Sequence, residues 1–408
     1  MASITVVGGS LGGLMAANML QRAGHAVTVL EKAAGSLDGR GAGIVTHRPL
    51  VAALARCGVA PEAALGVAVQ ERVVLGLDGA TVARATLPQV LTSWSRLYSL
   101  LREALPERCY VPGASVMEVQ QTSSQVTARC ADGRTFTSDM LIASDGIRST
   151  VRNQLAPEVE VNYAGYVAWR GVCDEAVLSQ RTLSSVFNTF GFGLPTGEQL
   201  IGYPVAGAGN SVQPGARRFN FVWYRPAPDD GSLQALMTDA DGQHHTQGLP
   251  PHKVSWKHLA QVRQSARDIL APQFAEILEK TAQPFLQPIY DCSSAQMAFG
   301  RIALMGDAAF VARPHVGMGV TKAAEDASVL VDSIEKFGAS PLALRDFQAQ
   351  RLGAGRSVVQ RSRQLGAYMQ SRGDATSTLQ RNAVDVMMQT AIDLSPQIRA
   401  TLRQPVPA

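Results

Sequence analysis

The sequence is poor in cysteine, and its cysteines lie far apart, with no Cys-x-x-Cys pair. The five are Cys57, Cys109, Cys130, Cys173 and Cys292. A disulfide-stabilised fold needs a denser set, and a structural zinc site needs closer ligand spacing. The histidine-rich stretch from His244 to His258 also lacks a metal-ligand pattern. We therefore expect neither a disulfide framework nor a metal site.

Long apolar runs and blocks of like charge are also absent. No apolar stretch approaches the ~20 residues that a membrane-spanning helix needs. The first residues run directly into a strand-like pattern, without the basic region of a signal peptide. The 37 basic and 33 acidic residues are spread along the chain and give a net charge of +4, so a polyanion-binding surface is not indicated. We expect a cytoplasmic protein that binds neither membranes nor nucleic acid.

The chain does have the length and composition of a large globular protein. It contains 408 residues, of which 46% are hydrophobic and 17% are charged. This length exceeds one typical hydrophobic core. The sequence therefore predicts two domains or one large α/β domain with an insertion.

The first residues carry a strand, a glycine-rich loop, a helix and a second strand. Ile4 to Val7 reads as a strand, Gly8 to Gly13 opens a helical pattern, and Ala26 to Leu30 reads as a strand that ends at Glu31. This order predicts a dinucleotide-binding unit, in which glycines let the backbone approach a pyrophosphate at the helix N-terminus and the acid binds ribose hydroxyls. Ser10 replaces the middle glycine of the fingerprint, and its hydroxyl is small enough to contact phosphate. A tight turn without a ligand is the alternative, and the fingerprint alone does not separate NAD from FAD.

Two later segments repeat a strand that ends in aspartate and glycine. The apolar run from Met140 to Ala143 precedes Asp145 and Gly146, and the run from Ile302 to Met305 precedes Gly306 and Asp307. With the first loop, these segments resemble the single-component FAD-dependent aromatic hydroxylases, the family of p-hydroxybenzoate and salicylate hydroxylases. The second segment matches that family's ASDGxxSxxR motif and the third matches its GDAAxxxxP motif, with Pro314 as the proline. The resemblance extends from Ile4 to about Gln370.

The resemblance implies an α/β fold with a Rossmann-like FAD-binding domain, an inserted antiparallel β-sheet substrate domain and C-terminal helices. It places the FAD-binding domain at residues 1–160 and 291–340, the substrate sheet at 161–290 and the helical segment at 341–408. The C-terminal helices of relatives often contribute to a dimer interface, so a homodimer is expected. No second GxGxxG follows, as expected where the nicotinamide cofactor binds only transiently.

The resemblance also assigns cofactor contacts. Asp307 contacts the ribityl chain, Arg96 reaches the FAD phosphates, and Arg40 is a weaker candidate for flavin contact. The backbone amides between His315 and the start of the next helix lie beside the flavin pyrimidine ring, where they stabilise negative charge on reduced flavin. The expected cofactor-binding residues are Gly8, Ser10, Leu11, Gly12, Gly13, Glu31, Lys32, Arg96, Asp145, Asp307, Gly317, Met318, Gly319 and Val320.

The resemblance implies a monooxygenase. NADH or NADPH reduces the flavin, O2 adds at flavin C4a, and the hydroperoxide transfers oxygen to an electron-rich ring. A base that takes the substrate's hydroxyl proton raises the rate, and histidine, with a pKa of about 6.5, suits this role. His47 and His315 lie in expected flavin-facing loops, and either fits the base. Tyr203, in an expected sheet strand, is a candidate donor to the ring. A solvated loop histidine and a packed sheet tyrosine are the alternatives.

The amino-acid sequence of the expected sheet segment from Tyr163 to Gly171 is most similar to the corresponding segment of hydroxypyridine hydroxylases. We therefore expect a small hydroxylated N-heteroaromatic substrate. A benzenoid phenol such as salicylate, a flavin reductase or dehydrogenase on the same fold, and a flavin-binding sensor are the alternatives, because fold alone does not fix function. Oxygen consumption coupled to product formation separates them.

Overall fold

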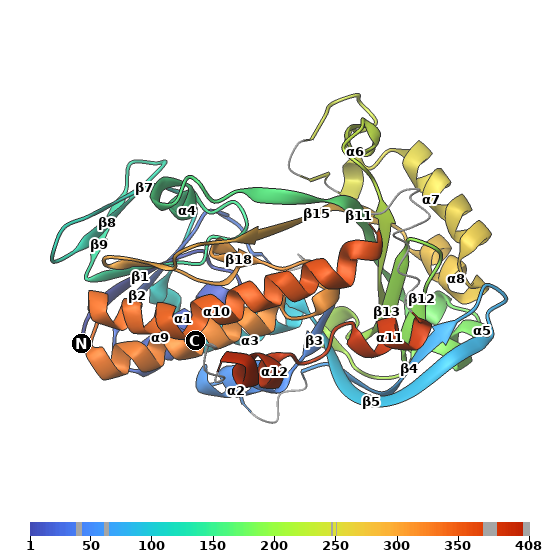
Figure 1. The fold of residues 1–408 in the computed structure, drawn as a ribbon, viewed down its shortest axis with the longest axis horizontal. Helices are drawn as coiled ribbons and strands as arrows, with labels where there is room; N and C mark the ends of the chain where they lie inside the picture. The colour runs from blue at the N-terminus through green and yellow to red at the C-terminus, as the bar shows by residue number, and fades with distance from the viewer. Residues whose placement is uncertain (38–42, 61–64, 246–247, 250, 370–381, 403–408) are drawn as a thin grey trace, which may run out of the picture.

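The structure is a computed structural model, and it describes residues 1–37, 43–60, 65–245, 248–249, 251–369 and 382–402. In this part of the chain, one mostly parallel sheet and one larger, mainly antiparallel sheet lie end to end, with long helices along one side (Figure 1). A third, small sheet contains β7 (Val116–Gln121), β8 (Val126–Cys130) and β9 (Thr135–Ser138).

The six-stranded sheet has the order β16-β17-β10-β1-β2-β6. Its strands are β1 (Ser3–Val7), β2 (Ala26–Glu31), β6 (Tyr110–Pro112), β10 (Met140–Ala143), β16 (Ala298–Phe299) and β17 (Ile302–Leu304). All neighbours pair in parallel except β16, which is antiparallel to β17. Val7 is in register with Ala143, and Ala143 with Leu304, so β1, β10 and β17 end at one edge. The three loops that carry the sequence motifs therefore emerge side by side.

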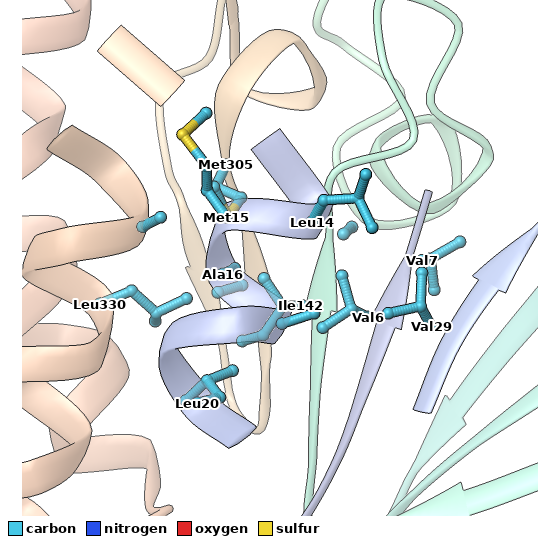
Figure 2. Close-up of a cluster of buried hydrophobic side chains, with 14 of the residues drawn as sticks. Val6, Val7, Leu14, Met15, Ala16, Leu20, Val29, Ile142, Met305 and Leu330 are labelled. Carbon is cyan, nitrogen blue, oxygen red and sulfur yellow. The ribbon is translucent and has the colours of Figure 1, made fainter. Parts of the chain in front are cut away.

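Helices α1 (Leu11–Arg22) and α9 (Gly319–Phe337) cover this sheet. The sequence of α1 is almost continuously apolar, and α1 packs between the sheet and α9. Figure 2 shows Leu14 and Leu20 of α1 among Val6 of the sheet and Leu330 of α9, and all four side chains are fully buried. Because burial of each such side chain contributes about 1.5–3 kcal/mol, this core fixes the helix starts against the strand ends. Helix α10 (Pro341–Gly366) packs along α9 (Figure 1).

The larger sheet has the order β18-β15-β11-β14-β13-β12-β4-β5-β3. Its strands are β3 (Gly43–Thr46), β4 (Val67–Leu75), β5 (Thr81–Ser93), β11 (Val161–Asp174), β12 (Phe190–Gly193), β13 (Gln199–Val205), β14 (Arg218–Pro226), β15 (Phe285–Ser293) and β18 (Phe310–Val311). Neighbours are antiparallel except β4 and β12. Alternation along β14 sends Phe221 and Trp223 to one face and Val222 and Tyr224 to the other.

The two faces of this sheet have different neighbours. One packs against α7 (Trp256–Ile269) and α8 (Pro272–Lys280). The proline stands at the first position of α8, where its missing N–H costs no helical hydrogen bond. The other face carries tyrosines and phenylalanines and meets Met387 and Ala391 from the C-terminal part of the chain.

The predicted α/β architecture with an antiparallel sheet is present. The sheet also takes in β3, β4, β5 and β18, which lie in stretches that the sequence-based division assigned to the FAD-binding domain. The remaining helices are α2 (Arg48–Arg56), α3 (Trp94–Ala104), α4 (Thr150–Leu155), α5 (Gln180–Thr182), α6 (Ser232–Leu236), α11 (Ala383–Gln389) and α12 (Ser395–Leu402). None of the helices in the described ranges is long and apolar enough to cross a membrane.

Candidate flavin site and catalytic pocket

The glycine loop after β1 is shaped by close backbone contacts. Gly8 has φ +104°, and a Cβ there would lie 2.4 Å from the carbonyl oxygen of Ser144. A Cβ on Gly13 would lie 1.9 Å from the carbonyl oxygen of Gly8. These positions exclude any side chain, so the loop can turn tightly from β1 into α1 and lie against the loop that follows β10.

The acid at the end of β2 is tied to this loop. Glu31 is buried, and its Oε2 accepts a hydrogen bond from the Gly9 N–H at 2.8 Å, while Oε1 accepts one from the Ala33 N–H at 2.8 Å. A carboxylate has about four acceptor positions, so these two bonds leave capacity for ribose hydroxyls. The structure thus gives Glu31 a loop-holding contact that the sequence did not predict.

A cavity of about 240 Å³ opens between the loops after β1, β2 and β10. Its lining includes Ser10, Glu31, Lys32, Trp94 and Asp145. Ser10 precedes α1 without making a side-chain capping bond. The first amides of a helix, here those of Leu11, Gly12 and Gly13, have no acceptor within the helix and point towards anions. This donor set and cavity fit the adenosine and pyrophosphate parts of FAD.

Arg96 lies in the first turn of α3 and is half-buried. Its backbone N–H is capped by Ser93 Oγ at 3.1 Å, which fixes the helix start, and Trp94 at that start lines the cavity just described. The start of α3 therefore lies at the expected phosphate region. Direct contact between Arg96 and a phosphate stays a prediction.

The motif after β10 connects two parts of the site. Asp145 Oδ2 accepts a hydrogen bond from the Val151 N–H at 3.3 Å, and burial raises the pKa of this carboxyl group. Arg152, almost fully buried, donates to the carbonyl oxygens of Ile147 at 2.6 Å and Ala308 at 3.2 Å. The last arginine of the ASDGIRSTVR motif thus fastens this loop to the GDAA loop after β17.

Asp307 stands at the edge of a second cavity, of about 840 Å³. The lining also includes Arg148, Pro288, Tyr290 and Pro314. The Asp307 side chain is 53% exposed, so its carboxylate can accept hydrogen bonds from a ligand such as the ribityl chain. Desolvation raises its pKa, and the nearby Lys322 ammonium opposes this shift.

Lys322 is a charged residue that the sequence analysis did not identify. Its side chain has no exposed surface, and Nζ lies 4.0 Å from Asp307 Oδ1 and 3.9 Å from Asp326 Oδ2. Asp326 accepts hydrogen bonds from the Gly306 N–H at 3.0 Å and from Arg351 Nε at 2.7 Å. Nζ has no hydrogen-bond partner in the described part of the chain. This buried lysine lies beside Asp307, the carboxylate that is expected to bind the ribityl chain, and supplies positive charge to this end of the site.

In the loop before α9, the Gly317 N–H donates to the Pro314 carbonyl oxygen at 2.9 Å. Gly317 has φ +71°, and a Cβ there would lie 2.6 Å from Cα of Ala391. Gly317 is required by its backbone conformation and by the C-terminal segment that packs against it. Gly319 has no atom within 4 Å of a Cβ position, Met318 is fully buried, and Val320 follows in the first turn of α9.

His47 lies at the N-terminus of α2 and contacts the first turn of α9. Its Nδ1 is 3.0 Å from Thr321 Oγ1, and Nε2 has no hydrogen-bond partner in the described residues. Burial lowers the pKa of His47, an effect that Asp393 opposes. A neutral imidazole at pH 7, with one nitrogen bound by Thr321, has the chemistry of a general base.

His315 is also brought to the site, but its ring is held by α10. The side chain is fully buried, and Nε2 lies 2.9 Å from the carbonyl oxygen of Ser362. Because a carbonyl oxygen only accepts, Nε2 carries the proton and the lone pair of the neutral ring is at Nδ1. The rings of Tyr166 and Tyr224 lie 6.2 Å and 5.5 Å from the imidazole, between centroids.

Tyr203 faces β3 from the neighbouring part of the large sheet. A Cβ on Gly43 would lie 2.7 Å from Tyr203 Oη and 2.9 Å from Asn220 Nδ2. Asn220 is fully buried, and its Oδ1 accepts a hydrogen bond from the Gly43 N–H at 3.1 Å. Burial raises the pKa of Tyr203 to about 12, so its hydroxyl stays protonated and can donate.

The structure thus brings together the loops after β1, β10 and β17, and places His47 and Tyr203 at opposite ends of β3. The sequence analysis missed Thr321, Lys322 and Asn220. A polar residue within the apolar run from Arg218 to Arg225 was an available signal for Asn220, whereas nothing local indicated the other two. Arg40 lies outside the described residues.

Comparisons with known proteins agree with this geometry. Residues 1–192 match a family described as FAD binding domain, and residues 163–291 match one described as FAD binding domain-like. The 2,6-dihydroxypyridine 3-monooxygenase of Paenarthrobacter nicotinovorans is 31% identical to this chain, over 91% of this chain and 92% of that protein. Aurachin C monooxygenase/isomerase of Stigmatella aurantiaca is 29% identical, over 89% and 88% of the two chains.

The same relationship appears in three dimensions. The solved structure of 2,6-dihydroxypyridine-3-hydroxylase from Arthrobacter nicotinovorans has a TM-score of 0.85 to this chain at 29% identity, and the match covers 92% of this chain and 95% of that one. The predicted fold and the FAD cofactor are therefore confirmed. This chain belongs to the FAD-dependent aromatic hydroxylases and is a flavoprotein monooxygenase.

Proposed function

We propose that this enzyme hydroxylates a small, already hydroxylated N-heteroaromatic ring of the hydroxypyridine class, using NADH or NADPH and O2. The substrate class is supported by the similarity over nearly the whole chain to a 2,6-dihydroxypyridine 3-monooxygenase. The observation that carries the chemistry is the contact between His47 and Thr321. It places an imidazole on the helix turn where the flavin ring is expected.

In this proposal His47 is the general base. When the Thr321 hydroxyl accepts from Nδ1–H, Nε2 has the lone pair that can take the proton of a substrate hydroxyl. The low pKa of the buried ring keeps that lone pair available at neutral pH. Removal of the proton makes the ring more electron-rich at the carbon that is attacked.

Tyr203 and Asn220 orient the substrate. Both polar groups lie at one end of β3, and Asn220 Nδ2 has no hydrogen-bond partner within the described ranges. Buried donors of this kind cost free energy unless an acceptor is present. A ring oxygen or nitrogen of the substrate is a fitting acceptor. His315, held by Ser362, forms part of the pocket wall and is the second candidate for the base.

The cofactor's place follows from the loops. Ser10, the first amides of α1, Glu31 and Lys32 would hold the adenosine and pyrophosphate, and Asp307 the ribityl chain. The amides of Met318, Gly319 and Val320 would face the flavin ring. When bound, FAD supplies the redox chemistry that activates O2. Residues 1–160 and 291–340 form the FAD-binding part in this proposal, and the large sheet roofs the substrate.

The test follows NAD(P)H oxidation, O2 consumption and product formation with FAD-loaded enzyme and a panel of hydroxypyridines and benzenoid phenols. Stimulation by a hydroxypyridine, with one O2 consumed for each hydroxylated product, is expected. Stimulation only by phenols such as salicylate would replace the substrate class and keep the chemistry. Oxidation of NAD(P)H by a substrate without O2 uptake would instead identify a reductase or dehydrogenase.

A further inference from the structure

A buried arginine of the large sheet holds the C-terminal segment in place. Arg72, in the middle of β4, has no exposed surface. Its Nη1 donates to the carbonyl oxygens of Met387 at 2.5 Å and Thr390 at 2.6 Å, and its Nη2 donates to that of Ala391 at 3.0 Å. These oxygens belong to the end of α11 and the turn after it. A cation at the C-terminus of a helix satisfies carbonyls that have no partner within the helix.

The guanidinium is itself fixed on its other sides. Gln89 Oε1 accepts from Nε at 3.0 Å and from Nη2 at 2.7 Å, and Gln89 Nε2 donates to the Ala391 carbonyl at 3.1 Å. The guanidinium carbon lies 4.7 Å from the centre of the Phe190 ring. Every acceptor that the structure gives this cation is an uncharged oxygen. An ordinary buried arginine is paired with an acid. Here the planar guanidinium instead matches the positions of several carbonyl oxygens, and no acid neutralises its charge within the described residues.

The held turn contacts the loop that carries His315, and it carries an acid that acts on His47. The Ala391 N–H donates to the His315 carbonyl oxygen at 3.1 Å, and Ala391 packs against Gly317. On the other side, the charge of Asp393 raises the pKa of His47, and the charge of Arg72 lowers it. Gln199 Nε2 also donates to Thr390 Oγ1 at 3.0 Å, which ties the turn to β13. Helix α11 lies against β4 and β5 (Figure 1), at the face of the sheet that carries the aromatic residues.

We propose that the turn Thr390–Asp393 is a wall of the substrate pocket and that Arg72 is the positioning residue that holds it there. The inference rests on the proposed function. It extends that function to a segment more than three hundred residues from Arg72 in sequence. Arg72 acts through the turn, which packs against the Gly317 loop and donates to the His315 carbonyl oxygen.

Arg72→Lys tests the anchor, because lysine keeps the charge but cannot reach three carbonyls as a planar fork. FAD should still bind, because neither Arg72 nor the turn contacts the glycine loop after β1 or Asp307, which hold the pyrophosphate and the ribityl chain in the proposed function. The KM for the activating aromatic compound should rise about tenfold or more, with a smaller change in kcat, and more of the NAD(P)H oxidised should yield H2O2 instead of product. Arg84→Lys, at an exposed arginine of β5 paired with Glu71, is the matched control and should change neither value.

Asp393→Asn tests the turn without disturbing the buried anchor. Asp393 raises the pKa of His47, so its neutralisation should move the acid limb of kcat/KM to lower pH. Asp385→Asn, on α11, is the control and should leave the limb in place. A purely structural turn would change stability but not this pH profile.

Hydrogen exchange gives a readout that does not depend on the substrate. In FAD-loaded Arg72→Lys, amides of residues 383–394 should exchange faster than in the wild type, while those of α9 should not change. Unchanged exchange, unchanged KM and an unmoved acid limb would overturn the inference. If no aromatic compound is turned over, the proposed function fails, and the exchange result still decides whether Arg72 anchors the turn.

Discussion

Replacing His47 with glutamine tests the proposed base directly. Glutamine has similar reach and can still hydrogen-bond Thr321, but it cannot hold the substrate proton. His47 contacts Thr321 of α9 and no residue of the glycine loop from Gly8 to Gly13, so we expect FAD to remain bound. General base catalysis contributes about 10²–10⁴-fold. We therefore expect kcat/KM to fall about 10²–10⁴-fold. At about 1.36 kcal/mol per decade, this is a loss of about 2.7–5.4 kcal/mol of transition-state stabilisation.

The pH dependence makes this prediction specific. Burial lowers the pKa of His47 below its ordinary value of 6.5, and a base works only when it is unprotonated. Wild-type kcat/KM should therefore be flat at neutral pH and fall only as the pH drops through that lowered value. His47→Gln should lose this acid limb along with the rate. His25→Gln, at a histidine distant from the site, is the control.

The assay is steady-state hydroxylation at several pH values, with the flavin spectrum recorded first to confirm equal FAD content. Turnover within twofold of the wild type, with the same acid limb, would remove His47 from the mechanism and leave His315 as the base.

Three further predictions concern the cofactor and a thiol. Asp307→Ala should weaken FAD binding by about 10–100-fold, the effect of losing hydrogen bonds to a charged acceptor, and full FAD occupancy after purification would contradict the ribityl role. Lys322→Met should raise the pKa of Asp307 further, so that on acidification FAD affinity is lost at a higher pH than in the wild type. Fluorescence titration of the apoprotein with FAD at several pH values measures this, with Lys336→Met as the control. Equal pH profiles of FAD affinity in Lys322→Met and the wild type would argue against a role for Lys322. Burial raises the pKa of the Cys57 thiol to about 12, so this thiol should not react with maleimide at pH 8 in the folded protein. Rapid labelling of Cys57 would show that the core around the end of α2 opens.

Much of the cofactor site could be predicted because its signals are local. A strand, a glycine turn and a helix start are read from a few neighbouring residues, and β1, β10 and β17 were each located this way. Packing between distant segments has no such signal. The contact of Arg72 with the carbonyls of Thr390 and Ala391 involves backbone atoms that any residue supplies. For the same reason, Gly317 was predicted as a glycine of the flavin loop, while its packing partner, Ala391, was not foreseen.

Lys322 and Thr321 show a second limit. Both follow Gly319 in the first turns of α9, where the sequence predicts only a helix. Which way each side chain points depends on how α9 crosses the sheet. That crossing is set by the core around Leu330 and Met305, not by the motif itself (Figure 2).

The parallel pairing of β10 with β1 and β17 has a consequence for how the protein is made. These neighbouring strands come from the start, the first half and the last third of the chain. Parallel strands so far apart in sequence form slowly, because long loops must close before any pairing is gained. During synthesis, the flavin site remains incomplete until the residues up to α9 have emerged. Flavin can therefore stabilise only a nearly complete chain, and bound flavin reports that all three segments have assembled.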